Sequence, residues 1–197
     1  SEYGASVVTN LDELYDVDVL FTMVSTGKDL NDVYFGSKGV LSNSAKKPKI
    51  LIDCSSVGSD ESEAIRSKLS DMGIEYLACP VSGNGKAVKA GVLSIVASGP
   101  KGTFDTVKPY LEIIAPKGVS YVGEGELARF CKIAHNVMLG VVIQNLAEIT
   151  VLAEKAGVPR HAFLNFMNNS VMGSIFTKYK SNAFVNLDWT TTFTAPL

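Results

Sequence analysis

Short runs of apolar, often β-branched residues alternate with segments of helical periodicity along the first 122 residues. An apolar run bounded by polar or glycine-rich stretches is typical of a buried strand. Such runs predict strands at residues 16–24, 49–53, 74–78, 93–98 and 119–122. Apolar residues at helical spacing predict helices at residues 28–35, 60–72 and 104–114. This alternation predicts a doubly wound α/β domain with a largely parallel sheet.

The helix expected at residues 60–72 has both a start and a stop signal. Ser59 or Asp60 is expected to cap its first turn, because a side-chain oxygen there accepts a hydrogen bond from a free backbone N–H. Gly73 is expected to end the helix, because glycine readily adopts the left-handed conformation found after a last turn.

The pattern changes after Gly125. Residues 126–156 contain no proline and one glycine, and they are followed by Gly157-Val158-Pro159, a typical helix stop. Such a helix would be about 45 Å long at ~1.5 Å per residue, which is long for a crossover between strands. It predicts an interdomain helix, followed by another helix from residue 160. We therefore expect two domains, residues 1–124 and residues 125–197, the second all-α.

Composition excludes several classes of function. The formal net charge is −2 and the basic residues are scattered, which gives no support for nucleic-acid binding. The longest apolar run in the long helix, residues 137–143, is far shorter than the ~20 residues that span a bilayer, so no membrane is expected. No basic signal sequence begins the chain, and Cys54, Cys79 and Cys131 lie far apart. A reducing cytoplasm is expected, with no disulfide framework and no metal site.

One motif resembles a dinucleotide-binding turn. Residues 123–128 match G-x-G-x-x-A, and Glu148 follows twenty residues later. Glu124 and Glu126 would place two negative charges beside a pyrophosphate, and no strand follows to complete a βαβ unit. Residues 123–128 are therefore predicted to be a structural turn into the long helix.

Two segments contain residues suited to chemistry. The segment from Pro80 to Gly85 directly follows a strand, where α/β sheets place their ligand sites. The Ser82 hydroxyl and the backbone N–H groups around Gly83 suit a carboxylate, although an ordinary glycine-rich turn is an equally good interpretation. A nucleophilic serine is disfavoured, because no G-x-S-x-G elbow is present.

The second segment lies on the long helix. Lys132 and Asn136 are four residues apart and therefore share one face. Apolar neighbours such as Phe130 and Ile133 suggest that desolvation lowers the pKa of the lysine and suits it to proton transfer. Spacing alone favours a solvated lysine on an amphipathic helix over a catalytic one. His135 lies off that face and is interpreted as structural.

With these motifs in their order, the chain resembles the β-hydroxyacid dehydrogenase family, which includes 3-hydroxyisobutyrate dehydrogenase, tartronate semialdehyde reductase and, more distantly, 6-phosphogluconate dehydrogenase. Residues 18–25 resemble the family strand ending in M-L-P, and residues 53–56 resemble its D-x-S-T segment. Residues 80–91 resemble P-V-S-G-G with the following glycine, and residues 132–136 resemble K-x-x-N-N. The resemblance implies a Rossmann-type domain and reversible hydride transfer between NAD or NADP and a small β-hydroxyacid.

The resemblance also implies roles for individual residues. Lys132 is the expected catalytic acid/base. The expected substrate contacts are Ser82, Gly83, Asn84 and Asn136, and the expected cofactor contacts are Met23, Val24, Ser25 and Ser56. The family further implies a homo-oligomer formed through the long helix.

The chain departs from the family pattern at Asn84, Ser25 and His135, where the family has glycine, proline and asparagine. The family's first strand and its G-x-G-x-x-G are not found, and residues 193–197 resemble the stretch before a K-D motif that is also missing. We therefore expect a Rossmann-type sheet incomplete at its start, followed by a truncated all-α domain. A non-catalytic nucleotide- or partner-binding member of the fold is the alternative, and Lys132 disfavours an imine reductase.

Overall fold

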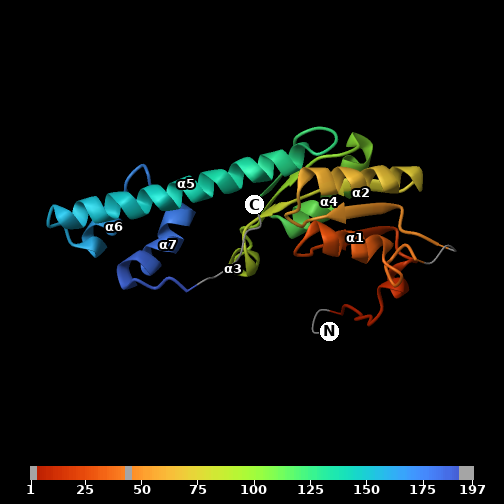
Figure 1. Ribbon diagram of the computed structural model, residues 1–197, viewed down its shortest axis with the longest axis horizontal. Coiled ribbons are helices and arrows are strands. Elements are labelled where there is room, and N and C mark those ends of the chain that lie inside the picture. The colour runs from red at the N-terminus through yellow and green to blue at the C-terminus, as the bar shows by residue number, and fades with distance from the viewer. Residues whose placement is uncertain (1–3, 43–45, 191–197) are drawn as a thin grey trace. The chain divides into compact units, whose positions relative to one another are not determined.

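The computed structural model describes residues 4–42 and 46–190 of the chain. The resemblance at residues 193–197 lies outside the described residues. Figure 1 shows the arrangement of the elements. In chain order they are the 3-10 helix η1 (Leu11–Leu14), β1 (Val19–Thr22), α1 (Gly27–Phe35), β2 (Ile50–Asp53), α2 (Ser59–Asp71), β3 (Glu75–Ala78), β4 (Val81–Ser82), α3 (Gly85–Lys89), β5 (Ser94–Ala97), α4 (Lys101–Ile114), β6 (Gly118–Tyr121), α5 (Leu127–Lys155), α6 (Arg160–Asn169) and α7 (Ile175–Asn186).

Every predicted strand and helix is present, although the first strand is shorter than the apolar run that predicted it. The predicted cap of α2 is wrong. Gly58 occupies the N-cap position, and its N–H donates to the Glu61 carboxylate at 3.3 Å, so the cap interaction comes from the first turn itself. Gly73 follows α2 with φ +70°, which confirms the predicted stop. The short elements β4 and α3 and the helix α7 were not predicted.

The strands form two three-stranded sheets, one parallel and one mixed, which an isolated bridge joins. β1, β2 and β3 are parallel and in the order β1-β2-β3, so that Thr22, Asp53 and Ala78 share one edge. β4 pairs antiparallel with β5, an isolated antiparallel bridge joins Ala78 to Ser98, and β6 is parallel to β5. The predicted parallel arrangement therefore holds for β1–β3, whereas β5 and β6 run in the opposite direction.

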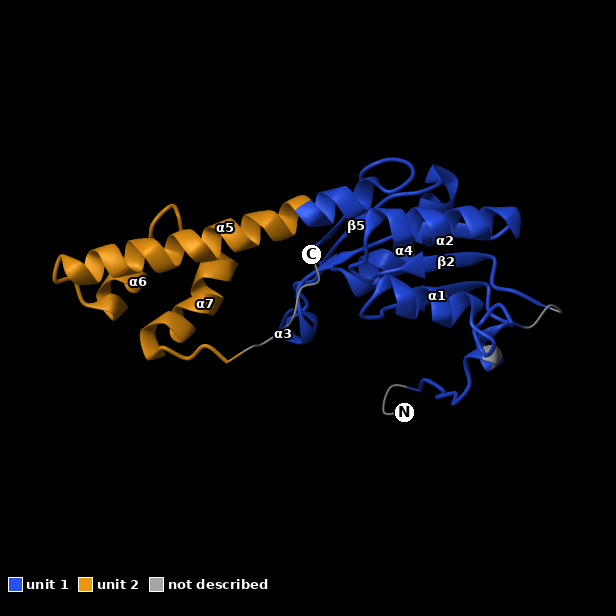
Figure 2. Ribbon diagram, viewed as in Figure 1, with its two compact units in different colours: residues 1–133, 195–197 blue, residues 134–194 orange. Residues whose placement is uncertain are grey.

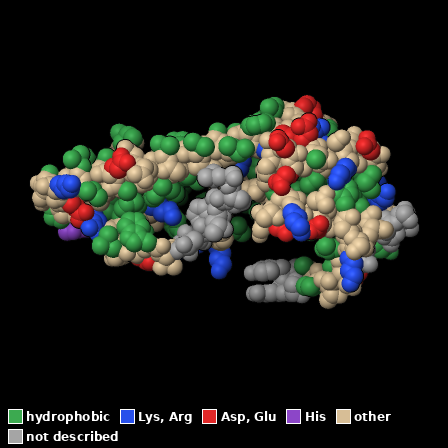
Figure 3. All heavy atoms as spheres, in the orientation of Figure 1, with side chains coloured by type: hydrophobic (Ala, Val, Ile, Leu, Met, Phe, Trp, Pro, Cys, Tyr) green, Lys and Arg blue, Asp and Glu red, His purple; other side chains and the backbone are tan. Residues whose placement is uncertain are grey.

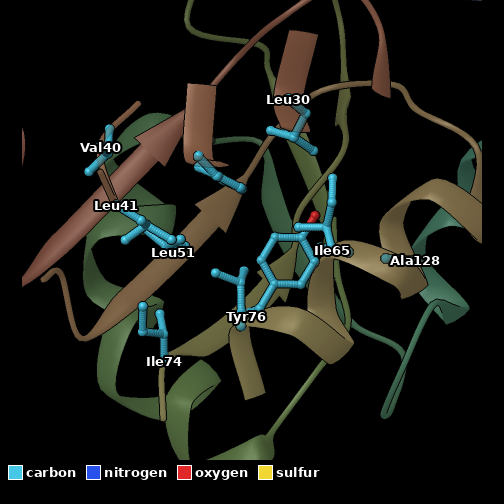
Figure 4. Packing of buried hydrophobic residues seen from close by; sticks show 11 residues of the cluster. Leu30, Val40, Leu41, Leu51, Ile65, Ile74, Tyr76 and Ala128 are labelled. Carbon is cyan, nitrogen blue, oxygen red and sulfur yellow. The ribbon is translucent and has the colours of Figure 1, made fainter. Parts of the chain in front are cut away.

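Alternate residues of the strands enter two separate cores, as the two-residue period of a strand requires. Leu51 and Tyr76 pack with α1, α2 and Ala128 of α5, while Ile52 and Leu77 pack with α4. Figure 4 shows the first cluster, in which Tyr76 lies near Ile65. Helices therefore cover both faces of the sheet, and the predicted doubly wound architecture is confirmed.

The chain divides into two compact units inside α5 (Figure 2). Unit 1 includes residues 4–133, and unit 2 includes residues 134–190. Unit 2 consists of the rest of α5 with α6 and α7, and its small core contains Leu146, Leu164 and Phe184. The expected domain boundary at residue 124 lies just before α5 and therefore differs from this division.

Much of α5 is apolar and exposed. Val137, Met138 and Val141 are among its exposed hydrophobic residues. Hydrophobic side chains line the visible side of this helix in Figure 3. Averaged over 18 residues the helix has a mean hydropathy of 1.5, so by length and composition it could cross a membrane, and 11% of that window is buried. The prediction that no membrane is involved considered only the continuous apolar run at residues 137–143. It missed the apolar character of the whole helix, because the polar residues around that run do not lower the mean hydropathy of the helix enough. One such helix is weak evidence for a membrane span.

Candidate functional site

The loops that follow β1 and β2 meet at the carboxyl edge of the parallel strands. The Val24 N–H donates to the Ser55 Oγ at 2.8 Å, and this Oγ donates to Asp53 at 2.7 Å. Met23 is 62% exposed, and Ser25 is also exposed. The two loops that contain the predicted cofactor contacts are thus joined directly.

Ser56 is the fourth predicted cofactor contact. It directly follows Ser55 and is half-buried. Its position places a second hydroxyl at the carboxyl end of β2. In α/β folds the crevice at this edge is the usual place for a ligand.

A buried arginine lies beneath these loops. The Arg129 side chain is 1% exposed, and its guanidinium donates to the Asp53 carboxylate, which is fully buried. The same guanidinium donates to the Tyr76 hydroxyl at 3.0 Å, to the Ser62 hydroxyl at 3.1 Å and to the Ser55 carbonyl. Arg129 of α5 therefore contacts β2, β3, α2 and the loop after β2.

The cluster is balanced in charge. Arg129 and Arg66 are matched by Asp53 and Glu126, and the Arg66 Nε donates to Glu126 at 2.9 Å. The second Glu126 oxygen accepts no hydrogen bond among the described residues and lies 3.9 Å from the Arg129 Nε. Burial by itself lowers the pKa of Arg129, but Tyr76 and Asp53 outweigh burial and the pKa is raised. The guanidinium therefore stays charged in the interior.

The aromatic and thiol groups around the cluster remain neutral. Burial raises the pKa of the Tyr76 and Tyr34 hydroxyls, and it raises the pKa of the Cys54 thiol to about 12. A thiol with so high a pKa is a poor nucleophile. The cluster is therefore suited to holding elements together, not to covalent chemistry.

The predicted carboxylate loop lies at β4 and the start of α3. Ser82 ends β4 and is half-buried. Gly83 has φ +135°, and a Cβ there would lie 2.7 Å from the Ala87 Cβ, so the position requires glycine. The Asn84 Oδ1 accepts hydrogen bonds from the N–H groups of Lys86 and Ala87 and so caps α3. Capping uses the side-chain oxygen of Asn84, and its predicted substrate contact stays a prediction.

Lys132 lies on α5, three residues after Arg129. It is half-buried, and among the described residues it makes no ion pair. Desolvation by burial lowers its pKa below the ordinary value of 10.5. The apolar neighbours Phe130 and Ile133 are themselves 58% and 44% exposed.

Asn136 is half-buried and lies one turn after Lys132 on the same helix. The Asn136 Oδ1 lies 3.2 Å from the His135 Nδ1. By helical periodicity, Arg129, Lys132 and Asn136 share one side of α5. The side of α5 that holds Lys132, the predicted catalytic residue, and Asn136, a predicted substrate contact, therefore begins with the buried arginine.

The turn before α5 has a structural role, as predicted. Gly123 and Gly125 have φ +114° and +62°. The Ser98 hydroxyl donates to the Gly125 carbonyl at 2.7 Å and accepts from the Ala128 N–H at 3.0 Å. The Ser98 side chain thus satisfies the Ala128 N–H, a backbone donor that a phosphate at this helix start would need.

Sequence reasoning missed the roles of Arg129, Tyr76 and Glu126 and gave none to Asp53. Two signals were available. Arg129 is the one arginine in a long apolar helix, and Asp53 ends an apolar strand with a charge. Their pairing was invisible, because they are 76 residues apart in the sequence.

Comparison with known proteins identifies the class of protein to which the chain with this site belongs. Residues 2–123 match the family of the NAD-binding domain of 6-phosphogluconate dehydrogenase. The chain belongs to this family, and its relatives include dehydrogenases and reductases of small hydroxyacids. The predicted family and Rossmann-like fold are confirmed.

The chain is similar to individual proteins of this class. The chain is 31% identical over 140 residues to 2-hydroxy-3-oxopropionate reductase of Escherichia coli, covering 71% of this chain and 47% of the relative. It is 29% identical to 3-hydroxyisobutyrate dehydrogenase of Pseudomonas aeruginosa, covering 80% of this chain and 52% of the relative. The crystal structure of 3-hydroxyisobutyrate dehydrogenase from Salmonella typhimurium matches with a TM-score of 0.78 at 26% identity, covering 92% and 63% of the two chains. The chain thus spans about half the length of the curated relatives it matches.

Proposed function

We propose that the protein containing this chain is an oxidoreductase that transfers a hydride between NAD or NADP and a small β-hydroxyacid. The main support is the position of Lys132. It is half-buried, makes no ion pair among the described residues, and lies one turn after an arginine that contacts the loop of the predicted cofactor site. A lysine with a lowered pKa is suited to exchange a proton with a substrate hydroxyl.

The residues at the carboxyl edge fit a nicotinamide cofactor. Met23 offers an exposed apolar surface, while Ser25 and Ser56 offer hydroxyls suited to a ribose. Val24 is fixed by its hydrogen bond to Ser55, so the loop is already ordered. When bound, the nicotinamide would supply the hydride donor or acceptor.

The β4–α3 loop would hold the substrate carboxylate. Ser82 provides a hydroxyl, and Gly83, at a positive φ, has no side chain that could cover its backbone N–H. Asn136 would orient the substrate hydroxyl from one turn beyond Lys132. Lys132 would accept the hydroxyl proton during oxidation and return it during reduction.

We also propose that the protein is a homo-oligomer that associates through α5 in the cytoplasm. The exposed apolar residues Val137, Met138 and Val141 lie on this helix, and burying them against a second copy would remove them from water. Small hydroxyacids are the expected substrates, in line with the names of the relatives.

The test compares Lys132→Ala with wild type in the natural open reading frame that contains residues 1–197. General acid–base catalysis contributes about 10²- to 10⁴-fold, so kcat for the best hydroxyacid should fall within that range. The dissociation constant for NADH or NADPH, measured by fluorescence titration, should stay within about threefold of wild type, because the cofactor contacts lie on other elements.

Lys178→Ala is the matched control, because Lys178 is an exposed lysine on α7. It should keep wild-type kcat. A Lys132→Ala variant with wild-type turnover would exclude the proposed role of the lysine. Failure of the wild-type protein to bind either cofactor would favour the partner-binding alternative.

A further inference from the structure

The cluster around Arg129 takes no direct part in the proposed hydride transfer, although it contains the most buried charged side chains of the described residues. Arg129 and Asp53 are 1% and 0% exposed. A buried ion pair is costly to desolvate, and well-packed apolar residues of similar volume are often as stable or more so. Stability alone therefore does not explain why an arginine is placed here.

The hydrogen bonds of Arg129 are directional and come from several elements. The guanidinium donates to the Asp53 carboxylate, the Ser55 carbonyl and the hydroxyls of Ser62 and Tyr76. A planar guanidinium requires fixed geometry at each acceptor, unlike an apolar contact. These bonds therefore fix how far α5 is rotated about its axis and how far it extends past β2.

Asp53 links Arg129 to the loops after β1 and β2, which contain the predicted cofactor contacts. Its other oxygen accepts from the Ser55 Oγ at 2.7 Å and from the Thr22 Oγ1 at 3.0 Å. The Ser55 Oγ in turn accepts from the Val24 N–H. One carboxylate thus connects α5 to the ends of both β1 and β2.

Lys132 lies about 4.5 Å farther along α5 than Arg129, and about 60° around the helix. Within this distance a helix is rigid, so fixing the Arg129 side also fixes the direction of Lys132. A misplacement of about 1 Å can cost 10²-fold in rate.

We propose that Arg129 is a positioning residue that, through Asp53, holds Lys132 in register with the loops after β1 and β2. This proposal rests on the proposed function for its catalytic consequence. Its structural content, that Arg129 fixes the first turns of α5, does not depend on that function.

The experiment uses the natural open reading frame and removes both charges at once. Arg129→Met alone would leave Asp53 buried and unpaired, and that variant could simply unfold. The double variant Arg129→Met with Asp53→Asn is neutral and of similar volume, so it is expected to fold. The matched control is Arg160→Met with Glu154→Gln, which neutralises an ion pair at the other end of α5.

Two measurements decide the proposal. In the Arg129/Asp53 double variant, amide hydrogen exchange at residues 128–133 should be at least about tenfold faster, with residues 104–111 of α4 unchanged. Its kcat should fall about 100-fold. KM and the cofactor dissociation constant should stay within about threefold, because asparagine at position 53 keeps an oxygen that can accept from the Ser55 and Thr22 hydroxyls. The control variant should change neither quantity.

Unchanged exchange at residues 128–133 together with near-normal kcat would overturn the proposal. A loss seen equally in KM and cofactor affinity would also overturn it, because that result indicates general damage to the fold. If Lys132→Ala keeps wild-type turnover, the proposed function fails, and the exchange measurement alone then decides whether Arg129 fixes α5.

Discussion

The first two turns of α5 differ sharply from the turns that follow. In the first turns Ser98 and Arg129 fix the helix through hydrogen bonds to the strands and to the loop after β2. In the later turns Val137, Met138 and Val141 are exposed, although they are the residues that hydrophobicity predicts to be buried. One continuous helix thus has a buried arginine near its start and exposed apolar residues in its middle. Hydrophobic pattern identified the helix correctly but not which of its residues are buried.

The largest expected loss of stability is at the start of α5, where Arg129 pairs with Asp53. Asp53→Ala leaves Arg129 buried without its carboxylate, so the free energy of unfolding should fall by about 3–5 kcal/mol. Glu154→Ala breaks a more exposed pair with Arg160 and should cost about 1 kcal/mol or less. Urea unfolding of the two variants measures the contrast, and equal losses would contradict it.

A substitution in the exposed middle of α5 should change the association of two copies and leave the stability of the fold unchanged. Val141 is 62% exposed, so Val141→Glu should leave the free energy of unfolding of the monomer unchanged. If α5 joins two copies, a buried glutamate should raise the dissociation constant by about 10²-fold or more.

Light scattering at several protein concentrations measures the change in the dissociation constant of the oligomer. The matched control is Ile113→Glu, an equally apolar and more exposed position on α4, which should not alter the mass. A monomeric wild type, or a Val141→Glu variant with the wild-type mass, would exclude α5 as the interface.

A smaller effect is expected at the turn into α5. Ser98→Ala removes the hydroxyl that serves both Gly125 and Ala128, which should cost about 1–3 kcal/mol because the site is buried. Thr106→Ala removes an exposed hydroxyl that donates to the Gly102 carbonyl within α4, and it should be nearly neutral. Thermal unfolding distinguishes the two, and similar melting temperatures would mean that the Ser98 cap is unimportant.

The smallest effect concerns the charge of Lys132. Burial lowers its pKa below 10.5, so the folded state disfavours the charged form. This cost is fully present below the folded-state pKa and is relieved as pH rises through it towards 10.5.

Lys132→Met should therefore unfold at slightly higher urea at pH 7, with a gain of about 0.5 kcal/mol or less. The gain should disappear above pH 10.5. Lys178→Met, at an exposed position, should show no such trend. A gain that grows with pH would contradict the sign of the pKa shift.

The sequence alone determined the order of β1, β2, β3, β5 and β6 with the helices α1, α2 and α4 between them, the long helix and the turn at residues 123–128. These follow from local rules, because the period of apolar residues and the glycine and proline stops act over a few neighbouring positions. The same local pattern placed Lys132 and Asn136 on one side of α5. The family resemblance depended on such short motifs, and the comparison with known families confirmed it.

Only the tertiary structure decided what surrounds those residues. The degree of burial differs from residue to residue on this helix: Phe130 and Ile133 are exposed although apolar, and Lys132 is half-buried although charged. Arg129 and Asp53 meet across 76 residues of sequence, and β5 runs opposite to β3. Burial and pairing of this kind arise from how distant segments pack, and no local period encodes them.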